Sequence, residues 1–272
     1  MKMIPKIIHQ TWYDSNLPKI FQEISNENKK INNEFEYKLW TDDDSERIIE
    51  KLLEQDFPKV MDIFNKSKYG VQKADIKRIA ILYYFGGIYI DLDIMFLKPI
   101  IDLIDFNQHN DIFVALEPEE QTMKVFNKKN LLCNAFICAP PKHTIMKKAL
   151  ENIEKIYEDN GENIFSIFNC FGGDIITKSI MENNKEGCKL IKRNLIYPIS
   201  DPKIDLQRSE KDIQMLKKGY YNDAFMVHYW IHSNFESKEH IKKFEWNSNI
   251  SVNENVYLFF KSLYTQNKYL KD

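Results

Sequence analysis

Short apolar segments alternate along the chain with longer segments in which apolar residues recur at every third or fourth position. The apolar residues at 4–8 predict a first strand, and the alternation of apolar and charged residues at 35–39 predicts a second. Residues 67–85 have the helical period and precede Gly86-Gly87, which stops a helix, and a short buried strand at 88–90. The pattern thus predicts a helix that runs into a strand through a two-glycine turn.

The remainder of the chain continues this alternation. Further strands are predicted at residues 111–116, 134–139, 195–199 and 224–230. Helices are predicted at residues 143–158 and 174–183, after a helix capped by Thr41 and before an amphipathic helix around 256–263. Strands that alternate with helices predict an α/β sheet. Since no stretch rich in Pro, Gly or Ser divides the chain, we expect one domain over residues 1–235 and a helical extension over 236–272 packed on it.

Composition and charge narrow the classes of function. The 38 Lys and Arg residues nearly balance the 40 Asp and Glu residues, so the net charge of -2 predicts no nucleic-acid partner. The four cysteines, Cys133, Cys138, Cys170 and Cys188, have neither metal-site spacing nor the density of a disulfide scaffold, which suits a reducing compartment.

Membrane and targeting signals are weak. The opening MKMIPKIIHQ lacks a basic-then-apolar signal pattern, and the apolar stretch at 79–90 is interrupted by glycines and falls short of the roughly 20 residues that span a bilayer. We therefore expect a cytoplasmic protein without a transmembrane segment. Peripheral membrane contact through the amphipathic C-terminal helix stays open.

The segment from Ala74 to Asp93 carries the densest chemical signal. Asp91 and Asp93 stand where an apolar strand runs into a loop, so their carboxylates can bind one hard cation while a diphosphate fills its other positions. Such a cation neutralises the phosphate that departs during glycosyl transfer. Asp75 and Arg78 share one helix face, and because that helix is so apolar, lone charges on it need partners. The plainer interpretation is an acidic loop and an intrahelical ion pair.

These residues and three further segments resemble glycosyltransferase family 32, DXD-motif sugar transferases related to yeast-type α-1,6-mannosyltransferases and bacterial capsular polysaccharide transferases. A more distant similarity is to the catalytic domain of clostridial glucosylating toxins. Residues 4–12 resemble the opening strand of the family, 37–42 its second strand and 134–137 the strand after the metal site. About half of the chain is covered, in the family's order.

The resemblance implies a GT-A fold, a nucleotide-binding, Rossmann-like mixed sheet flanked by helices, with the catalytic domain at 1–235. It implies transfer of a hexose from a UDP- or GDP-sugar, with retention, to a glycan, a glycolipid or a protein. Asp91 and Asp93 would bind Mn²⁺ or Mg²⁺ and the donor, Asp75 and Arg78 would hold hydroxyls of the transferred sugar, and Trp12 would line the nucleobase.

The segment at 227–235 resembles the family's closing segment, which completes the metal site and covers the diphosphate. His228 would be the third metal ligand, with His232 or Ser233 as alternatives and Ser233 as a donor contact. The sequence departs from the family where Asn234 follows Ser233. It departs again at Phe171–Asp174, where Asp174 would contact the acceptor or, as we expect, start the next helix.

Two other functions fit parts of this pattern. The run from Ile88 to Asp93 also resembles the nucleophile motif of haloacid-dehalogenase-like phosphatases, in which Asp91 would attack phosphorus. That motif usually opens a sequence and continues with Thr or Val, where this chain has Met95. A non-catalytic nucleotide-sugar or carbohydrate-binding module is the second alternative. Turnover of a nucleotide-sugar with Mn²⁺ would distinguish the transferase from both.

Overall fold

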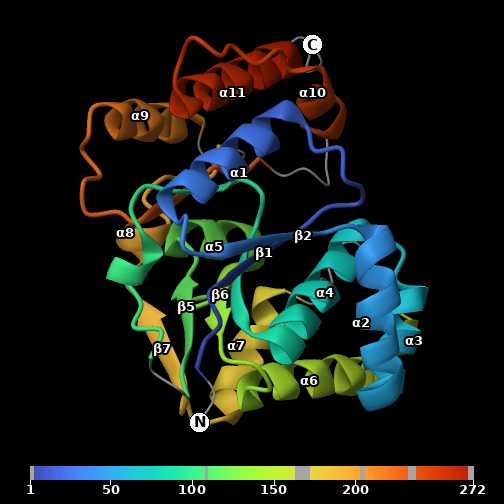
Figure 1. The fold of residues 1–272 in the computed structure, drawn as a ribbon. Coiled ribbons are helices and arrows are strands. Elements are labelled where there is room, and N and C mark those ends of the chain that lie inside the picture. The colour runs from blue at the N-terminus through green and yellow to red at the C-terminus, as the bar shows by residue number, and fades with distance from the viewer. Residues whose placement is uncertain (1–2, 108–109, 163–171, 203–205, 232–236, 269–272) are drawn as a thin grey trace.

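Six strands form a mixed sheet in the computed structural model, which describes residues 3–107, 110–162, 172–202, 206–231 and 237–268 (Figure 1). Within these residues the strand order is β2-β1-β3-β6-β5-β7. The strands are β1 (Ile7–Thr11), β2 (Glu36–Trp40), β3 (Gly87–Ile90), β5 (Ile112–Leu116), β6 (Leu132–Ala139) and β7 (Cys188–Ile191). The sheet confirms the predicted α/β class.

The direction of the strands brings distant segments to one edge of the sheet. β1 is parallel to β2 and to β3, and β5 is parallel to β7, whereas β6 is antiparallel to both β3 and β5. Only β6 is therefore reversed among the described strands of this sheet. The carboxyl ends of β1, β3 and β5 consequently meet the amino end of β6 at the same edge, where ligands bind in open α/β sheets.

Helices cover both faces of the sheet (Figure 1). One face packs against α1 and α11, which share a core with Ile8, Phe96 and Phe259. The other face packs against α3, α4, α6 and α7 around Trp40, Leu82 and Ile137. The described helices are α1 (Lys19–Ile31), α2 (Asp42–Asp56), α3 (Pro58–Lys66), α4 (Gly70–Phe85), η1 (Ile100–Asp102), α5 (Glu119–Phe126), α6 (Thr144–Asn160), α7 (Gly173–Glu182), α8 (Arg193–Ile196), α9 (Leu206–Lys217), α10 (Ser237–Lys243) and α11 (Val252–Lys268).

A second, two-stranded sheet follows the end of β3. It pairs β4 (Ile94–Phe96) with β8 (Met226–His228) in antiparallel register, so that Ile94 lies opposite His228. Asn28 of α1 anchors it, because its side-chain amide donates to the Ile94 carbonyl and accepts from the Phe96 N–H, both at 2.7 Å. The buried amide thus continues the hydrogen bonding of a strand and ties α1 to this sheet.

His9 locks the first two strands to the end of helix α4. Its Nδ1 accepts a hydrogen bond from Trp40 Nε1 at 3.0 Å, so the ring proton is on Nε2, which donates to the Gly86 carbonyl at 2.8 Å. Burial lowers the pKa of His9 to about 4, which keeps the ring neutral. Gly87 has φ +98°, and a Cβ there would lie 2.6 Å from the Ile7 carbonyl oxygen, so this close approach requires glycine.

The predicted strand at 195–199 is wrong. Helix α8 ends at Ile196, and residues 197–199 have no regular structure. The apolar side chains Ile196, Tyr197 and Ile199 are buried. Pro198, however, has no N–H that could donate to a neighbouring strand. The Leu195 carbonyl accepts its hydrogen bond from the Phe225 N–H. A segment that is buried without pairing as a strand has the same short apolar pattern in the sequence as a buried strand.

The other predicted elements are present with shifted ends. The strand predicted at 224–230 shortens to β8, because Trp230 adopts φ +57° and ends the extended backbone. The helix predicted at 67–85 begins at Gly70. Helix α1 and strands β4 and β7 were not predicted from the sequence, and the last two are too short for a clear period.

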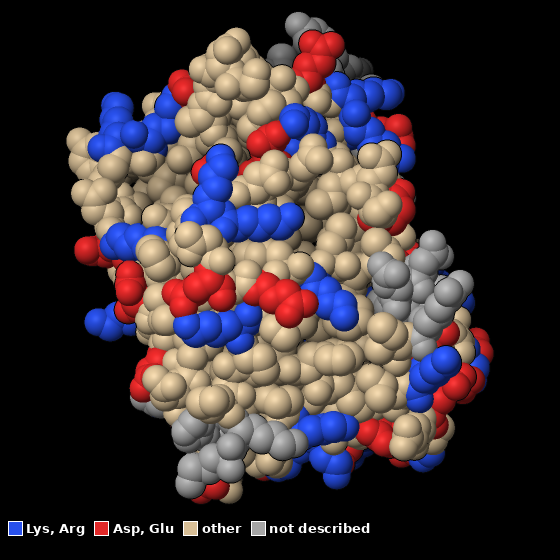
Figure 2. Space-filling model, in the orientation of Figure 1, with Lys and Arg blue, Asp and Glu red and all other residues tan. Residues whose placement is uncertain are grey.

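The face of the molecule shown in Figure 2 carries basic and acidic residues side by side, in keeping with the net charge of -2. This face therefore presents no continuous positive field for a polyanion. Among the described residues, no helix has the length and apolar character needed to cross a bilayer.

The neutral state of His9 should make stability fall in mild acid. Because the folded pKa of about 4 lies below the ordinary histidine pKa of 6.5, the unfolded chain binds the extra proton between these values. Stability is therefore lost as the pH falls from about 6.5 to about 4, by up to about 3 kcal/mol. Urea denaturation at several pH values should show this loss in the wild type, and a smaller one in His9→Gln, which keeps one donor and one acceptor. An unchanged pH dependence in His9→Gln would contradict the assignment.

Candidate active site

Asp91 and Asp93 follow β3 at the ligand-binding edge of the sheet. The Asp91 N–H donates to the Ala135 carbonyl of β6, and the Ile94 N–H donates back to the Asp91 carbonyl, which makes a tight turn. Asp93 is held by the segment after β8, because the Ile231 N–H donates to its Oδ2 at 2.8 Å. The turn therefore points both carboxylates at the same place although the two residues lie only two positions apart.

The structure brings His228 beside the two aspartates. Its Nε2 lies 3.2 Å from Asp93 Oδ1, and one ligand atom from each of Asp91, Asp93 and His228 lies within 4.8 Å of the others. The pairing of β4 with β8 places His228 opposite Ile94, and hence beside the turn that carries the aspartates. Two carboxylate oxygens and one imidazole nitrogen fit Mn²⁺ better than Mg²⁺, which prefers oxygen ligands alone.

The environment of His228 is strained and charged. Trp230 adopts φ +57°, which is rare for a bulky residue, and its ring centroid lies 3.9 Å from that of His228. Its Nε1 donates to the Ile199 carbonyl at 3.2 Å, which helps to hold this conformation. Burial opposes protonation of His228, but the Asp93 carboxylate more than offsets this and raises the pKa of the imidazole. A proton and a metal ion would therefore compete for His228.

Arg78 connects helix α4 to this cluster. Its Nη2 lies 3.4 Å from Asp75 Oδ1 and 3.3 Å from Asp91 Oδ1, and its Nη1 donates to the Asn134 carbonyl at 2.7 Å. The guanidinium carbon also lies 4.7 Å from the centre of the Tyr89 ring. Asp75 and Arg78 do form an intrahelical pair, but the pair is buried and extends to a third charge. Burial raises the pKa of Asp75 to about 6, although Arg78 opposes the rise.

Three residues that support these side chains were not singled out from the sequence. Asn134 donates through Nδ2 to Asp75 Oδ1 at 2.8 Å. Tyr89 donates its hydroxyl to Asp91 Oδ1 at 3.0 Å. A Cβ on Gly172 would lie 2.5 Å from Asn134 Nδ2, so the chain before α7 closes tightly over this point. The contact of Tyr89 with Asp91 could have been predicted from the sequence, because side chains two residues apart on a strand share a face. Asn134 and Gly172 come close to Asp75 only in the folded chain.

Trp12 lies at the same edge of the sheet, just beyond β1. Its N–H donates to the Trp40 carbonyl at 3.0 Å, and its partly buried ring packs edge-on against Phe21 with centroids 5.3 Å apart. Its Nε1 is buried without a hydrogen-bond partner in the described part of the chain. The position is compatible with the predicted nucleobase wall, but no contact joins Trp12 to the aspartates among the interactions of these residues.

Two further predicted residues have different outcomes. Ser233, predicted to contact the donor, and its neighbour His232 lie outside the described residues. Asp174 lies in the first turn of α7 and pairs with Lys128 at 2.7 Å, with both side chains about half exposed. The expectation that Asp174 starts a helix is thereby confirmed.

A second polar group, which the sequence did not indicate, lies near His228 and consists of Glu117, Cys133 and Tyr197. Glu117 directly follows β5, and its carboxyl group interacts with the Cys133 thiol and with the charge of His228. Burial raises the pKa of Glu117 to about 7. The buried Tyr197 hydroxyl lies near the Cys133 thiol, and burial raises its pKa. No local sequence pattern indicated this group, because its residues come from three separate segments of the chain.

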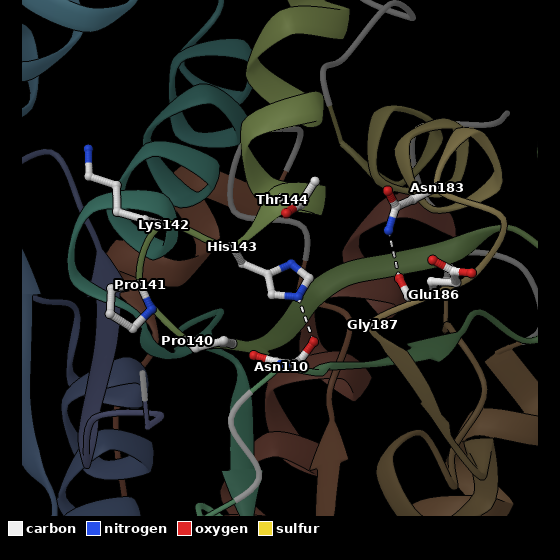
Figure 3. Close-up of a pocket in the computed structure, with 9 residues that line it drawn as sticks. All are labelled: Asn110, Pro140, Pro141, Lys142, His143, Thr144, Asn183, Glu186 and Gly187. Atoms are coloured by element: carbon white, nitrogen blue, oxygen red, sulfur yellow. Dashed lines mark hydrogen bonds between the residues drawn. The ribbon is translucent and has the colours of Figure 1, made fainter. Parts of the chain in front are cut away.

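The hollow in Figure 3 is at the wrong end of the sheet to serve this site. It begins directly after Ala139, which pairs with Gly87 at the start of β3, whereas the aspartates follow the end of that strand. Both ring nitrogens of His143 are engaged there, with the Asn110 carbonyl and with the Ile145 N–H. Residues lining the hollow are Asn110, Pro140, Pro141, Lys142, His143, Thr144, Asn183, Glu186 and Gly187.

Comparisons with known proteins agree with this geometry. Residues 18–112 match the family model described as "glycosyltransferase sugar-binding region containing DXD motif". Inositol phosphoceramide mannosyltransferase 1 of Schizosaccharomyces pombe is 31% identical over 158 residues, which cover 57% of this chain and 44% of the relative. The matched region thus spans less than half of that protein.

Two further similarities cover most of the chain. Uncharacterized glycosyltransferase L373 of Acanthamoeba polyphaga mimivirus is 30% identical over 199 residues, or 72% of this chain and 74% of the relative. The structure of PaToxG glycosyltransferase is 16% identical, with a TM-score of 0.50 over 96% of this chain and 87% of that chain, a likeness of fold that agrees with the GT-A type. The chain belongs to the family of glycosyltransferases that contain this DXD-motif sugar-binding region.

Proposed function

We propose that the protein is a metal-dependent glycosyltransferase that transfers a hexose from a UDP- or GDP-sugar, with retention, to a glycan or glycolipid acceptor. The observation that carries this proposal is the convergence of Asp91, Asp93 and His228 at the ligand-binding edge, with Arg78 joining Asp91 to Asp75. Asp75 on α4 is a third carboxylate, buried and outside the group of proposed ion ligands, so a site that only bound an ion would not need it. Membership of a glycosyltransferase family supports the same activity.

Each side chain has a distinct task in the proposed reaction. A divalent cation held by Asp91, Asp93 and His228 would neutralise charge on the departing nucleoside diphosphate. Asp75 and Arg78 bind hydroxyls of the transferred sugar, because one accepts and the other donates hydrogen bonds. Asn134 keeps both of them in place through its side chain and its carbonyl group. Their fixed positions orient the sugar before reaction.

The identity of the donor and acceptor can be approached from the relatives. The Schizosaccharomyces pombe relative is named as a mannosyltransferase that acts on inositol phosphoceramide. GDP-mannose is therefore the first donor to test, and a glycolipid is the first acceptor. UDP-glucose, UDP-galactose and UDP-N-acetylhexosamine are the comparison donors, since hexoses that differ at one hydroxyl share most contacts.

Mn²⁺ together with one nucleoside diphosphate should stabilise the folded chain. A ligand at 100 times its Kd adds about 2.7 kcal/mol, which raises the Tm of a domain of this size by about 5 to 10 °C. Thermal melts with UDP, GDP and CDP, each with and without Mn²⁺, measure this shift. A phosphatase would instead release phosphate from a phosphomonoester, and the absence of any shift across the panel would speak against the proposed donor site.

Asp93→Asn should abolish turnover while the fold persists. The substitution keeps the volume and one hydrogen-bond acceptor but removes the charge that binds the metal, so we expect kcat to fall about 100-fold or more. Nucleoside diphosphate release and Mn²⁺ titration calorimetry measure the two effects. Asp102→Asn, at an exposed position in η1, is the matched control and should behave as the wild type. Retained activity in Asp93→Asn at saturating Mn²⁺ would refute the ligand assignment.

Arg78→Lys should impair chemistry more than nucleotide binding. Lysine keeps the positive charge that the buried Asp75 needs, but it cannot reach Asp75, Asp91 and Asn134 with one fixed planar group. We expect kcat to fall about 100-fold while the affinity for the nucleoside diphosphate changes less than about threefold. Steady-state kinetics and calorimetry separate these quantities. A large loss of nucleotide affinity would place Arg78 at the phosphates instead of the sugar.

A further inference from the structure

Thr11 is the last residue of strand β1, at the ligand-binding edge of the sheet. β1 runs parallel to β3 with His9 opposite Tyr89. The same register brings Thr11 level with Asp91, just beyond the end of β3. Since alternate side chains of a strand share a face, Thr11 and Tyr89 lie on the same face of the sheet, the one that helix α4 covers.

Two hydrogen bonds join Thr11 to Asp91 through the hydroxyl group of Tyr89. That hydroxyl lies 2.9 Å from Thr11 Oγ1 and 3.0 Å from Asp91 Oδ1. An ionised carboxylate only accepts hydrogen bonds, so the single proton of the tyrosine hydroxyl goes to Asp91. The Thr11 hydroxyl must therefore donate to the Tyr89 oxygen. The carboxylate at one end thus sets the direction of both bonds.

The Tyr89 ring is fixed in place, so only its hydroxyl proton is free to rotate. The residue is 1% exposed, and the guanidinium carbon of Arg78 lies 4.7 Å from the centre of its ring. A donor on one side of the phenol oxygen directs the phenol proton to the other side, and the two hydrogen bonds strengthen each other in a buried site. Thr11, which is partly exposed, supplies that donor.

We propose that Thr11 is a positioning residue that acts on Asp91 through Tyr89. Its hydroxyl directs the phenol proton toward the carboxylate, which stays turned toward the other two proposed metal ligands. This inference rests on the proposed function, because it concerns how the chain prepares a cation site. The Asp91 side chain is 30% exposed, against 11% for Asp93, so it depends more on such support. Loss of a hydrogen-bond partner of a ligand typically costs about 10- to 100-fold in metal affinity.

Titration calorimetry with Mn²⁺ tests this role without turnover. Tyr89→Phe keeps the ring beside Arg78 and should weaken Mn²⁺ binding about 10- to 100-fold. Thr11→Val removes the hydroxyl but keeps a branched side chain, and should weaken binding about 3- to 10-fold. Thr11→Ser keeps the hydroxyl and should bind Mn²⁺ within about twofold of the wild type. In the Tyr89→Phe background, Thr11→Val should cause no further loss, because its effect passes through Tyr89.

The controls separate positioning from packing. Tyr84→Phe removes a tyrosine hydroxyl that donates to the Leu52 carbonyl, and it should leave Mn²⁺ binding unchanged. If Thr11 only packs in the strand, Thr11→Val binds Mn²⁺ like the wild type, and that result overturns the proposal. Losses that add in the double variant, or equal losses in Thr11→Ser and Thr11→Val, overturn it as well. Thermal melts without Mn²⁺ establish that each variant is folded. Failure of the wild type to bind Mn²⁺, alone or with UDP or GDP, refutes the proposed function itself.

Discussion

The buried guanidinium group of Arg78 lies between two carboxylates, the buried Asp75 of helix α4 and the partly exposed Asp91 that follows strand β3. Asp75 and Arg78 are not readily accommodated alone, because charges removed from water need partners. Burial raises the pKa of Asp75 even with Arg78 beside it, which shows how far the site depends on that one cation. The hydrogen bonds from Asn134 and Tyr89 complete the charge network. The shape of the site follows from the need to satisfy these charges.

The network requires helix and strand to approach closely, and the turn between them provides this. Gly87 lies so near the Ile7 carbonyl that no side chain would fit without displacement. His9 then ties Trp40 to the Gly86 carbonyl, so the two parallel strands and the helix end are held by one neutral imidazole. The histidine of the opening strand thus serves the structure, whereas His228 lies with Asp91 and Asp93 in a group that could hold a metal ion.

Much of the fold was predictable from local patterns, since a buried strand and an amphipathic helix each impose a period on the sequence. The failures have a common cause. The segment at 195–199 is apolar because it fills the core, and β8 is short because Trp230 leaves the extended conformation to pack on His228. Neither constraint is local. Strand β7 presents two exposed residues among its four and gave no apolar signal.

The sequence by itself determined the DXD pair at the end of an apolar strand, the Asp75–Arg78 helix face and the two-glycine turn, because each depends on residues close together in the chain. Only the tertiary structure decided that β6 is reversed, and thereby that Asn134 meets Asp75 and that Cys133 is near both Glu117 and His228. It also decided that His228 completes the cluster through the pairing of β4 with β8. Strand order and direction result from burial of both sheet faces at once, and a single sequence does not display that choice.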